Sequence, residues 1–232
     1  MIPILARDPE SSFPPANQAL DNPPGLLAAG GDLSPARLLN AYRQGIFPWY
    51  SEGQPILWWS PAPRCVLYPG SVHVSRRLRR RYNQGQFSLT ADQAFSQVIE
   101  ACSAPRRDQD GTWISDEMRA AYIRLHQLGI AHSVEVWAGD DLAGGIYGLA
   151  LGQVFFGESM FSRLESASKI ALVALCRQLV RWNFILLDCQ VSNPHLLSMG
   201  AEEISRKKFD HHLKSALGSD HWQPEFSTDS RW

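Results

Sequence analysis

Hydrophobic and polar positions follow two different periods along this chain. Between residues 92 and 102 the apolar side chains recur at intervals of three and four residues, which predicts a helix with one buried face. Three later runs, 132–137, 142–151 and 153–158, are rich in β-branched, aromatic and other apolar residues, and short turns separate them. Runs of this kind predict an antiparallel meander of three strands.

Helical and strand-like segments alternate through the rest of the chain. Strands are expected at 65–68, 87–90, 184–190 and near Ile204, and helices at 75–82, 115–129, 166–182, 193–199 and 206–217. The run 184–190 is almost continuously apolar, which is typical of a strand buried on both faces. The order of meander, long helix, buried strand and helix resembles that of acyl-CoA N-acyltransferases. The expected fold class is therefore α/β (α+β), with a mixed, mostly antiparallel sheet.

The first 63 residues differ from the rest of the chain because frequent proline and glycine residues interrupt regular secondary structure there. Only one helix fits there, from the N-cap Ser34 to Gly45. The Pro-Ala-Pro sequence that ends at residue 63 marks a boundary. We therefore expect a small, loop-rich N-terminal domain (1–63) and an acyltransferase-like catalytic domain (64–232).

The composition is that of an ordinary globular protein, with 232 residues, of which 44% are hydrophobic and 19% charged. There is no run of about 18 apolar residues to predict a transmembrane helix, and the N-terminus lacks the features of a secretory signal. The four cysteines are scattered without a C-x-x-C pair, which disfavours a zinc site and fits a reducing cytoplasm. We expect a cytoplasmic protein without a bound metal.

Positive charge is concentrated in one stretch, although the net charge is only −1. From residue 53 to residue 91 there is no acidic residue, whereas six arginines occur. Four of them lie on neighbouring positions of the helix expected at 75–82: Arg76, Arg77, Arg80 and Arg81. Basic stripes of this kind often bind phosphate groups. The alternative interpretation is a solvated, charged helix face.

Two polar residues end the buried strand. Asp188 and Gln190 are two positions apart, so an extended strand directs both side chains to one face and Cys189 to the other. The carboxyl end of a central strand is where α/β proteins place ligands. The pair therefore predicts the polar part of a binding site, or else a strand end whose polar groups bind the nearby backbone.

The segment 157–163 is expected between the third meander strand and the long helix. Acyltransferases that use coenzyme A carry a Gly-x-Gly-type loop at this junction, whose bare amides bind pyrophosphate. Here Gly157 is followed by bulky residues, which disfavours pyrophosphate binding and leaves an ordinary connection as the alternative. Aromatic residues in Pro- and Gly-rich loops, Trp49 and Trp113 among them, either stack on a nucleobase or pack in a small core.

Taken together, these segments resemble one family, the bacterial leucyl/phenylalanyl-tRNA–protein transferases. The matching residues are GLLAAGGDLSPARLLNAYRQGIFPWY (25–50), ILWWSPAPR (56–64), GTWIS (111–115), HSVEVW (132–137), GGIYG (144–148), FGESMFSR (156–163), ASK (167–169) and LDCQ (187–190). The resemblance extends in order over nearly the whole chain.

The resemblance implies a two-domain aminoacyltransferase. Such an enzyme transfers Leu, Phe or, less well, Met from aminoacyl-tRNA to the N-terminal Arg or Lys of an acceptor protein, which is thereby marked for degradation by the N-end rule pathway. The donor ester is already activated, so no cofactor is expected. The expected partners are aminoacyl-tRNA and acceptor proteins, without a membrane.

The resemblance also implies the roles of individual residues. Asp188 and Gln190 lie at the reacting ester, Glu158 helps to hold the acceptor, and the arginine cluster meets tRNA phosphates. Trp49 and Trp113 flank the terminal adenosine, with Tyr42 and Tyr122 nearby. The apolar donor pocket consists of Ile146, Phe155, Met160, Leu172, Leu175, Leu179 and Leu187, and Gly157 is a further substrate-binding residue.

The enzyme does not need a strong base, because roughly a tenth of the acceptor's α-amine, with a pKa of ~7.7–8.0, is already neutral at pH 7. We expect Gln190 to orient the amine and Asp188 to help accept its proton, with a ribose hydroxyl of the donor as an alternative relay. Three other functions would use parts of the same pattern: a tRNA-dependent transferase acting on peptidoglycan precursors, an acetyl-CoA N-acetyltransferase, and a non-catalytic RNA-binding module.

Overall fold

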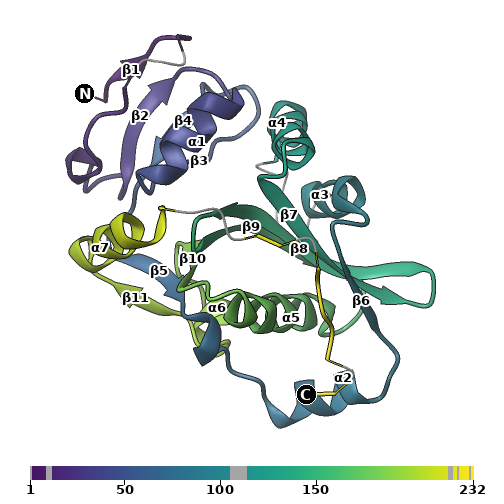
Figure 1. The fold of residues 1–232 in the computed structure, drawn as a ribbon. Helices are drawn as coiled ribbons and strands as arrows, with labels where there is room; N and C mark the ends of the chain where they lie inside the picture. The colour runs from purple at the N-terminus through teal and green to yellow at the C-terminus, as the bar shows by residue number, and fades with distance from the viewer. Residues whose placement is uncertain (1, 9–11, 105–113, 219–221, 224, 230) are drawn as a thin grey trace.

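The computed structural model describes residues 2–8, 12–104, 114–218, 222–223, 225–229 and 231–232. Its strands form two sheets, one of four strands and one of seven, with helices packed around them (Figure 1). None of the helices in these ranges is long and apolar enough to cross a membrane.

The smaller sheet is built from the N-terminal part of the chain. Its strand order is β1-β2-β4-β3, with bounds Ile4–Leu5 (β1), Leu26–Gly30 (β2), Phe47–Pro48 (β3) and Leu57–Trp59 (β4). A 3-10 turn covers Ala16–Gln18, and helix α1 covers Pro35–Arg43. The helix begins where the sequence predicts, because the Ser34 hydroxyl accepts a hydrogen bond from the Arg37 backbone N–H at 3.3 Å. The short strands were not predicted, since two- and three-residue strands leave no periodic pattern.

The larger sheet has the order β11-β5-β10-β9-β8-β7-β6. The strand bounds are Arg64–Leu67 (β5), Ser88–Ala91 (β6), Ala131–Ala138 (β7), Asp141–Leu151 (β8), Val154–Ser162 (β9), Leu186–Gln190 (β10) and Glu202–Ile204 (β11). Strands β9 and β10 pair in parallel, whereas the other neighbours pair antiparallel. The predicted mixed, mostly antiparallel sheet and its meander β7-β8-β9 are therefore confirmed.

Helices cover both faces of the larger sheet (Figure 1). Their bounds are Arg76–Asn83 (α2), Phe95–Ser103 (α3), Asp116–Gln127 (α4), Ala167–Arg181 (α5), Pro194–Ser198 (α6) and Arg206–Ala216 (α7), and a 3-10 turn covers Pro69–Ser71. One hydrophobic core lies between the sheet and α5. A second core joins the opposite face to α3, α4 and the smaller sheet, so the two sheets share one continuous apolar interior on that side.

Two expected elements have different bounds in the structure. The helix expected from residue 92 begins only at Phe95, because Asp92 has a φ of +58° and its carboxylate instead accepts hydrogen bonds from His132 and from the Ser133 backbone. The expectation that residues 157–163 connect a strand to a helix is wrong for most of them, since β9 continues to Ser162. Pairing with β8 extends the strand, and it places Glu158 and Met160 on a rigid element.

Candidate active site

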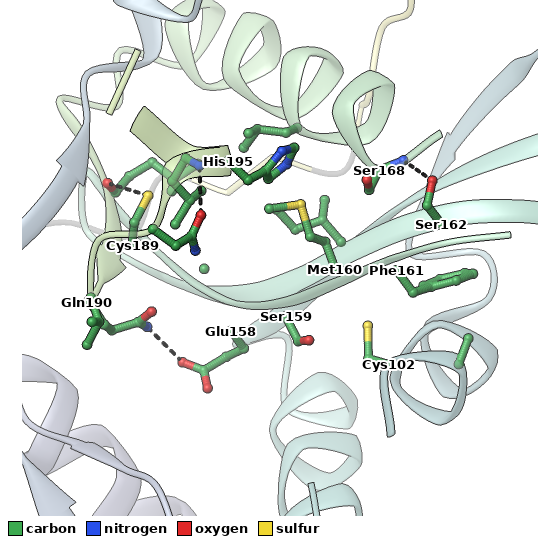
Figure 2. A pocket seen from close by; sticks show the side chains of 18 of the residues that line it. Cys102, Glu158, Ser159, Met160, Phe161, Ser162, Ser168, Cys189, Gln190 and His195 are labelled. Atoms are coloured by element: carbon green, nitrogen blue, oxygen red, sulfur yellow. Dashed lines mark hydrogen bonds between the residues drawn. The ribbon is translucent and has the colours of Figure 1, made fainter. Parts of the chain in front are cut away.

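A cavity of about 1430 Å³ opens along the carboxyl-terminal halves of β9 and β10 (Figure 2). Its walls also include the ends of α3 and β3, the first turns of α5, and α6. One part of the wall is apolar and includes Ile146, Met160, Leu172 and Leu187. Another part is polar and includes Glu158 and Gln190, which point toward one another in Figure 2. The cavity thus joins an apolar pocket to a carboxylate and an amide.

Two tyrosines and one glutamine bind the carboxylate of Glu158. The Tyr42 hydroxyl donates to Oε1 at 2.7 Å and the Tyr122 hydroxyl to Oε2 at 3.0 Å, while the Gln190 amide lies 3.4 Å from Oε1. The two tyrosine hydroxyl oxygens also lie within hydrogen-bond distance of each other, and both side chains are fully buried. Tyr42 and Tyr122 therefore hold the carboxylate of Glu158. The resemblance also expects both tyrosines near the terminal adenosine of the donor.

The pKa of Glu158 is raised to about 7, compared with an ordinary value of 4.5. Burial causes the increase, and the two tyrosine hydrogen bonds limit it because they stabilise the charged form. The nearby carboxylate of Asp188 raises the pKa further, and Arg64 lowers it. Glu158 therefore changes its charge within the neutral pH range, where a carboxylate is able to accept a proton.

Asp188 lies beside this cavity but does not line it. Its side chain is fully buried and forms two bonds with the equally buried Arg64, from Nε to Oδ1 at 2.8 Å and from Nη2 to Oδ2 at 2.6 Å. Oδ1 also accepts the backbone N–H of Gln190 at 3.0 Å. The sequence did not pair Arg64 with Asp188, because the two residues are 124 positions apart.

The end of β10 departs from simple strand alternation. The pairing with β5 shifts by one residue between Asp188 and Gln190, and Gln190 has a φ of +59°. A positive φ is uncommon for a residue other than glycine and often marks a functional site. This local bulge turns the Gln190 amide toward Glu158.

The expected donor-pocket residues fall into two layers. Ile146, Gly157, Met160, Leu172 and Leu187 line the cavity. The other three are buried in the core behind that wall and do not line it: Phe155, Leu175 and Leu179. The stripe on α5 thus serves both the pocket and the core, as expected for a helix with one wide apolar face.

The sequence singled out neither His195 nor Ser168, which also line the cavity. Figure 2 shows both above β9, on the side opposite Glu158. Burial and then the charge of Lys169 lower the pKa of His195, which favours its neutral form. A lone histidine at the start of a short helix carries no sequence signal of such a position.

Of the aromatic and basic residues expected to contact RNA, only Trp49 is among the residues that line the cavity in the described part of the chain. Trp49 is part of its wall and is 45% exposed, whereas Trp113 lies outside the described residues. On α2, the side chains of Arg76, Arg77 and Arg80 are exposed, and Arg81 is half-buried over the ring of Phe87.

The surroundings of α2 are not free of acids. Arg77 forms an ion pair with Glu165, which follows β9 and is 88 positions away in the sequence. The neighbouring Arg163 lines the cavity. The basic helix therefore begins close to one end of the cavity.

Within the described ranges, no three His, Cys, Asp or Glu side chains gather in a way that would hold a metal ion.

Comparisons with known proteins agree over the whole length of the chain. Residues 66–214 match the family model described as leucyl/phenylalanyl-tRNA protein transferase, and residues 31–62 match that of its N-terminal domain. The chain is 61% identical to the leucyl/phenylalanyl-tRNA–protein transferase of Alkalilimnicola ehrlichii over 90% of this chain and 82% of that protein. It is 56% identical to the one of Aromatoleum aromaticum over 100% of this chain and 94% of that protein. Among solved structures, an aminoglycoside acetyltransferase from a soil metagenome aligns with 62% of this chain and 96% of its own, at 10% identity and a TM-score of 0.35.

Proposed function

The chain belongs to the leucyl/phenylalanyl-tRNA protein transferase family, and we propose that it transfers Leu, Phe and, less well, Met to acceptor proteins that begin with Arg or Lys. It is an aminoacyltransferase whose donor is aminoacyl-tRNA. In this proposal the reaction takes place in the cytoplasm and marks its products for the N-end rule pathway. Residues 1–63 and 64–232 are two domains that meet at the cavity.

One observation carries the proposal: the cavity joins an apolar wall to the carboxylate of Glu158. The wall, with Met160, Leu172 and Leu187, suits an unbranched or γ-branched apolar side chain of the donor. The carboxylate suits an acceptor that carries a positive charge at its N-terminus. The apolar end therefore selects the donor and the polar end receives the acceptor.

The chemistry needs orientation and one proton transfer rather than activation of the donor. The acceptor amine attacks the ester carbonyl, the new C–N bond forms, and the C–O bond to the ribose of the tRNA breaks. Glu158 takes the proton from the amine and passes it to the departing ribose oxygen, which restores the ionised carboxylate. The amine attacks in its neutral form, and Glu158, with a pKa of about 7, is a base of suitable strength for the proton that the nitrogen loses as the C–N bond forms.

The proposal gives the two residues of the strand end different roles. Gln190 lines the cavity and orients the amine through its amide. Asp188 has both oxygens bound to Arg64 and does not line the cavity, so we assign the proton to Glu158 instead. Tyr42 and Tyr122 fix the carboxylate of Glu158 in the orientation that the amine meets.

The tRNA occupies the exposed side of the cavity in this proposal. Trp49 stacks on the terminal adenosine, with Trp113 as the second aromatic residue. The exposed arginines of α2, together with Arg81, contact phosphate groups of the tRNA. Arg77 would exchange its ion pair with Glu165 for such a contact.

A transfer assay tests the proposed function. The protein is incubated with tRNA charged with radiolabelled Leu, Phe or Ile and with a peptide that begins with Arg, and label in the peptide is measured. We expect transfer of Leu and Phe, little transfer of the β-branched Ile, and none to the same peptide beginning with acetylated Arg. Transfer from acetyl-CoA, transfer only to a peptidoglycan precursor, or tRNA binding without transfer would each refute it.

A further inference from the structure

Arg64 is a fully buried cation at the junction of three parts of the fold. It is the first residue of β5, and its side chain is 1% exposed. Its guanidinium carbon lies over two aromatic rings, 4.9 Å from the ring centre of Phe47 and 4.6 Å from that of Phe209. Phe47 belongs to β3 of the smaller sheet and Phe209 to α7. Contacts with two rings from different elements restrict the guanidinium group to one position.

The edge of the guanidinium group that carries Nε and Nη2 faces the carboxylate of Asp188. The two bonds, of 2.8 Å and 2.6 Å, use both carboxylate oxygens, which is the bidentate geometry that an arginine fork provides and a lysine does not. One of these oxygens also accepts the backbone N–H of Gln190 at 3.0 Å. A continuous chain of contacts thus runs from Arg64 through Asp188 to the backbone of Gln190.

Gln190 needs such support because its backbone is strained. Its φ of +59° lies in the left-handed region, which is unfavourable for a residue with a Cβ atom such as glutamine. The structure around a residue must hold this conformation for it to persist. The conformation is also what brings the Gln190 amide to within 3.4 Å of Glu158 in the cavity.

We propose that Arg64 is a positioning residue for aminoacyl transfer, which acts by holding Asp188 so that Asp188 holds Gln190 in its left-handed conformation. Arg64 itself does not reach the cavity. The inference rests on the proposed function, since it names what sets the geometry of the amide that orients the acceptor amine. It also makes the packing of the smaller sheet and α7 part of the active site, because Phe47 and Phe209 set the orientation of Arg64.

The test compares Arg64→Lys with a matched control, Arg37→Lys. Arg37 is also fully buried, pairs with Asp32, and lies over the ring of Phe13 at 5.7 Å, but it belongs to α1. Both variants keep the charge and lose the fork. We expect Arg64→Lys to lower kcat by about 10–100-fold with little change in KM for the aminoacyl-tRNA, as a small misplacement of a reacting group does. Arg37→Lys should lower only the melting temperature.

A double-mutant cycle with Gln190→Ala separates positioning from general destabilisation. If Arg64 acts through Gln190, then Arg64→Lys has little further effect on kcat in the Gln190→Ala background. The proposal would be overturned if the two substitutions lowered kcat by factors that multiply in the double variant. It would also be overturned if Arg64→Lys had the same kcat as Arg37→Lys. If Arg64→Lys does not fold, Arg64→Met/Asp188→Asn removes both buried charges together. That variant should fold and still show a reduced kcat, and a normal kcat would overturn the proposal.

A readout without catalysis separates this inference from the function on which it rests. In NMR spectra of the free protein, the backbone amide signal of Gln190 should shift in Arg64→Lys and stay in place in Arg37→Lys. Failure of the wild-type protein to transfer Leu or Phe would refute the proposed function. An unmoved Gln190 signal would refute the role of Arg64, whether or not the protein transfers amino acids.

Discussion

Exchanging Glu158 for glutamine should change how the transfer rate depends on pH. The carboxyl group has a pKa of about 7 because burial disfavours its charge, and two tyrosines and Gln190 hold it at the cavity. In the proposed mechanism only the ionised form accepts the proton of the amine. Glutamine has nearly the same shape, keeps an acceptor oxygen for the tyrosines, and does not titrate.

The expected magnitude follows from two titrations. With a pKa of about 7, Glu158 is ionised to about nine-tenths at pH 8 and to about one-tenth at pH 6. The neutral fraction of the acceptor amine, with its pKa of ~7.7–8.0, also falls about tenfold for each pH unit. Below pH 7 a plot of log kcat/KM for the acceptor against pH should therefore have a slope near 2 in the wild type, by the rule that each required deprotonation adds about 1. In Glu158→Gln the slope should be near 1, and the rate at pH 8 about 10²-fold lower or more.

The assay measures initial rates of transfer from Leu-tRNA to an Arg-initiated peptide between pH 5.5 and pH 8.5, with the peptide well below its KM. Glu135→Gln is the control, since Glu135 is a fully buried carboxylate on β7 that does not line the cavity. That variant should keep the wild-type slope. Equal slopes in the wild type and in Glu158→Gln would refute the assignment of the proton to Glu158.

Three further outcomes follow from the same structure. Folding raises the pKa of Glu158, so the stabilisation that its protonated form provides is lost as the pH rises from 4.5 to 7. In urea unfolding, the free energy of unfolding of the wild type should therefore fall by about 2–3 kcal/mol relative to Glu158→Gln between pH 5 and pH 8. A constant difference between the two proteins would contradict the raised pKa. Leu172→Phe should reduce transfer of Phe more than of Leu, because the larger donor meets the filled wall first, and an unchanged ratio in a competition assay would remove Leu172 from the donor pocket. The double variant Arg76→Ala/Arg80→Ala should raise KM for aminoacyl-tRNA and leave transfer from an aminoacyl-adenosine unchanged. A plot of the logarithm of the tRNA association constant against the logarithm of the salt concentration should become less steep, by roughly 0.7–0.9 for each phosphate group that the variant no longer binds. The exposed Arg43 of α1 provides the control substitution, and an equal reduction with the minimal donor would place the α2 arginines away from the tRNA.

Local patterns were sufficient for most of the secondary structure. The α5 helix follows from the spacing of its apolar residues, and the meander from strand-like runs separated by short turns. The β10 strand follows from a nearly continuous apolar run, because a strand buried on both faces needs apolar residues at every position. The N-caps Ser34, Ser75 and Ser115 mark where helices begin for an equally local reason, since each hydroxyl binds a backbone N–H three residues on. The same locality explains why the strand was predicted to end at residue 158, since pairing with β8, and not the residues themselves, extends it to Ser162.

The resemblance to a family was also contained in the sequence, and it pointed to Glu158 and Gln190, which the structure brings within 3.4 Å of each other at the cavity. Only the tertiary structure decided how those residues are held. Tyr42 is 116 positions from Glu158, and Arg64 is 124 from Asp188. Pairs so distant depend on how whole elements pack, and no spacing along the chain encodes that. Burial among those elements is also what moves the Glu158 pKa to about 7, since a carboxyl group loses its hydration only when the fold closes around it.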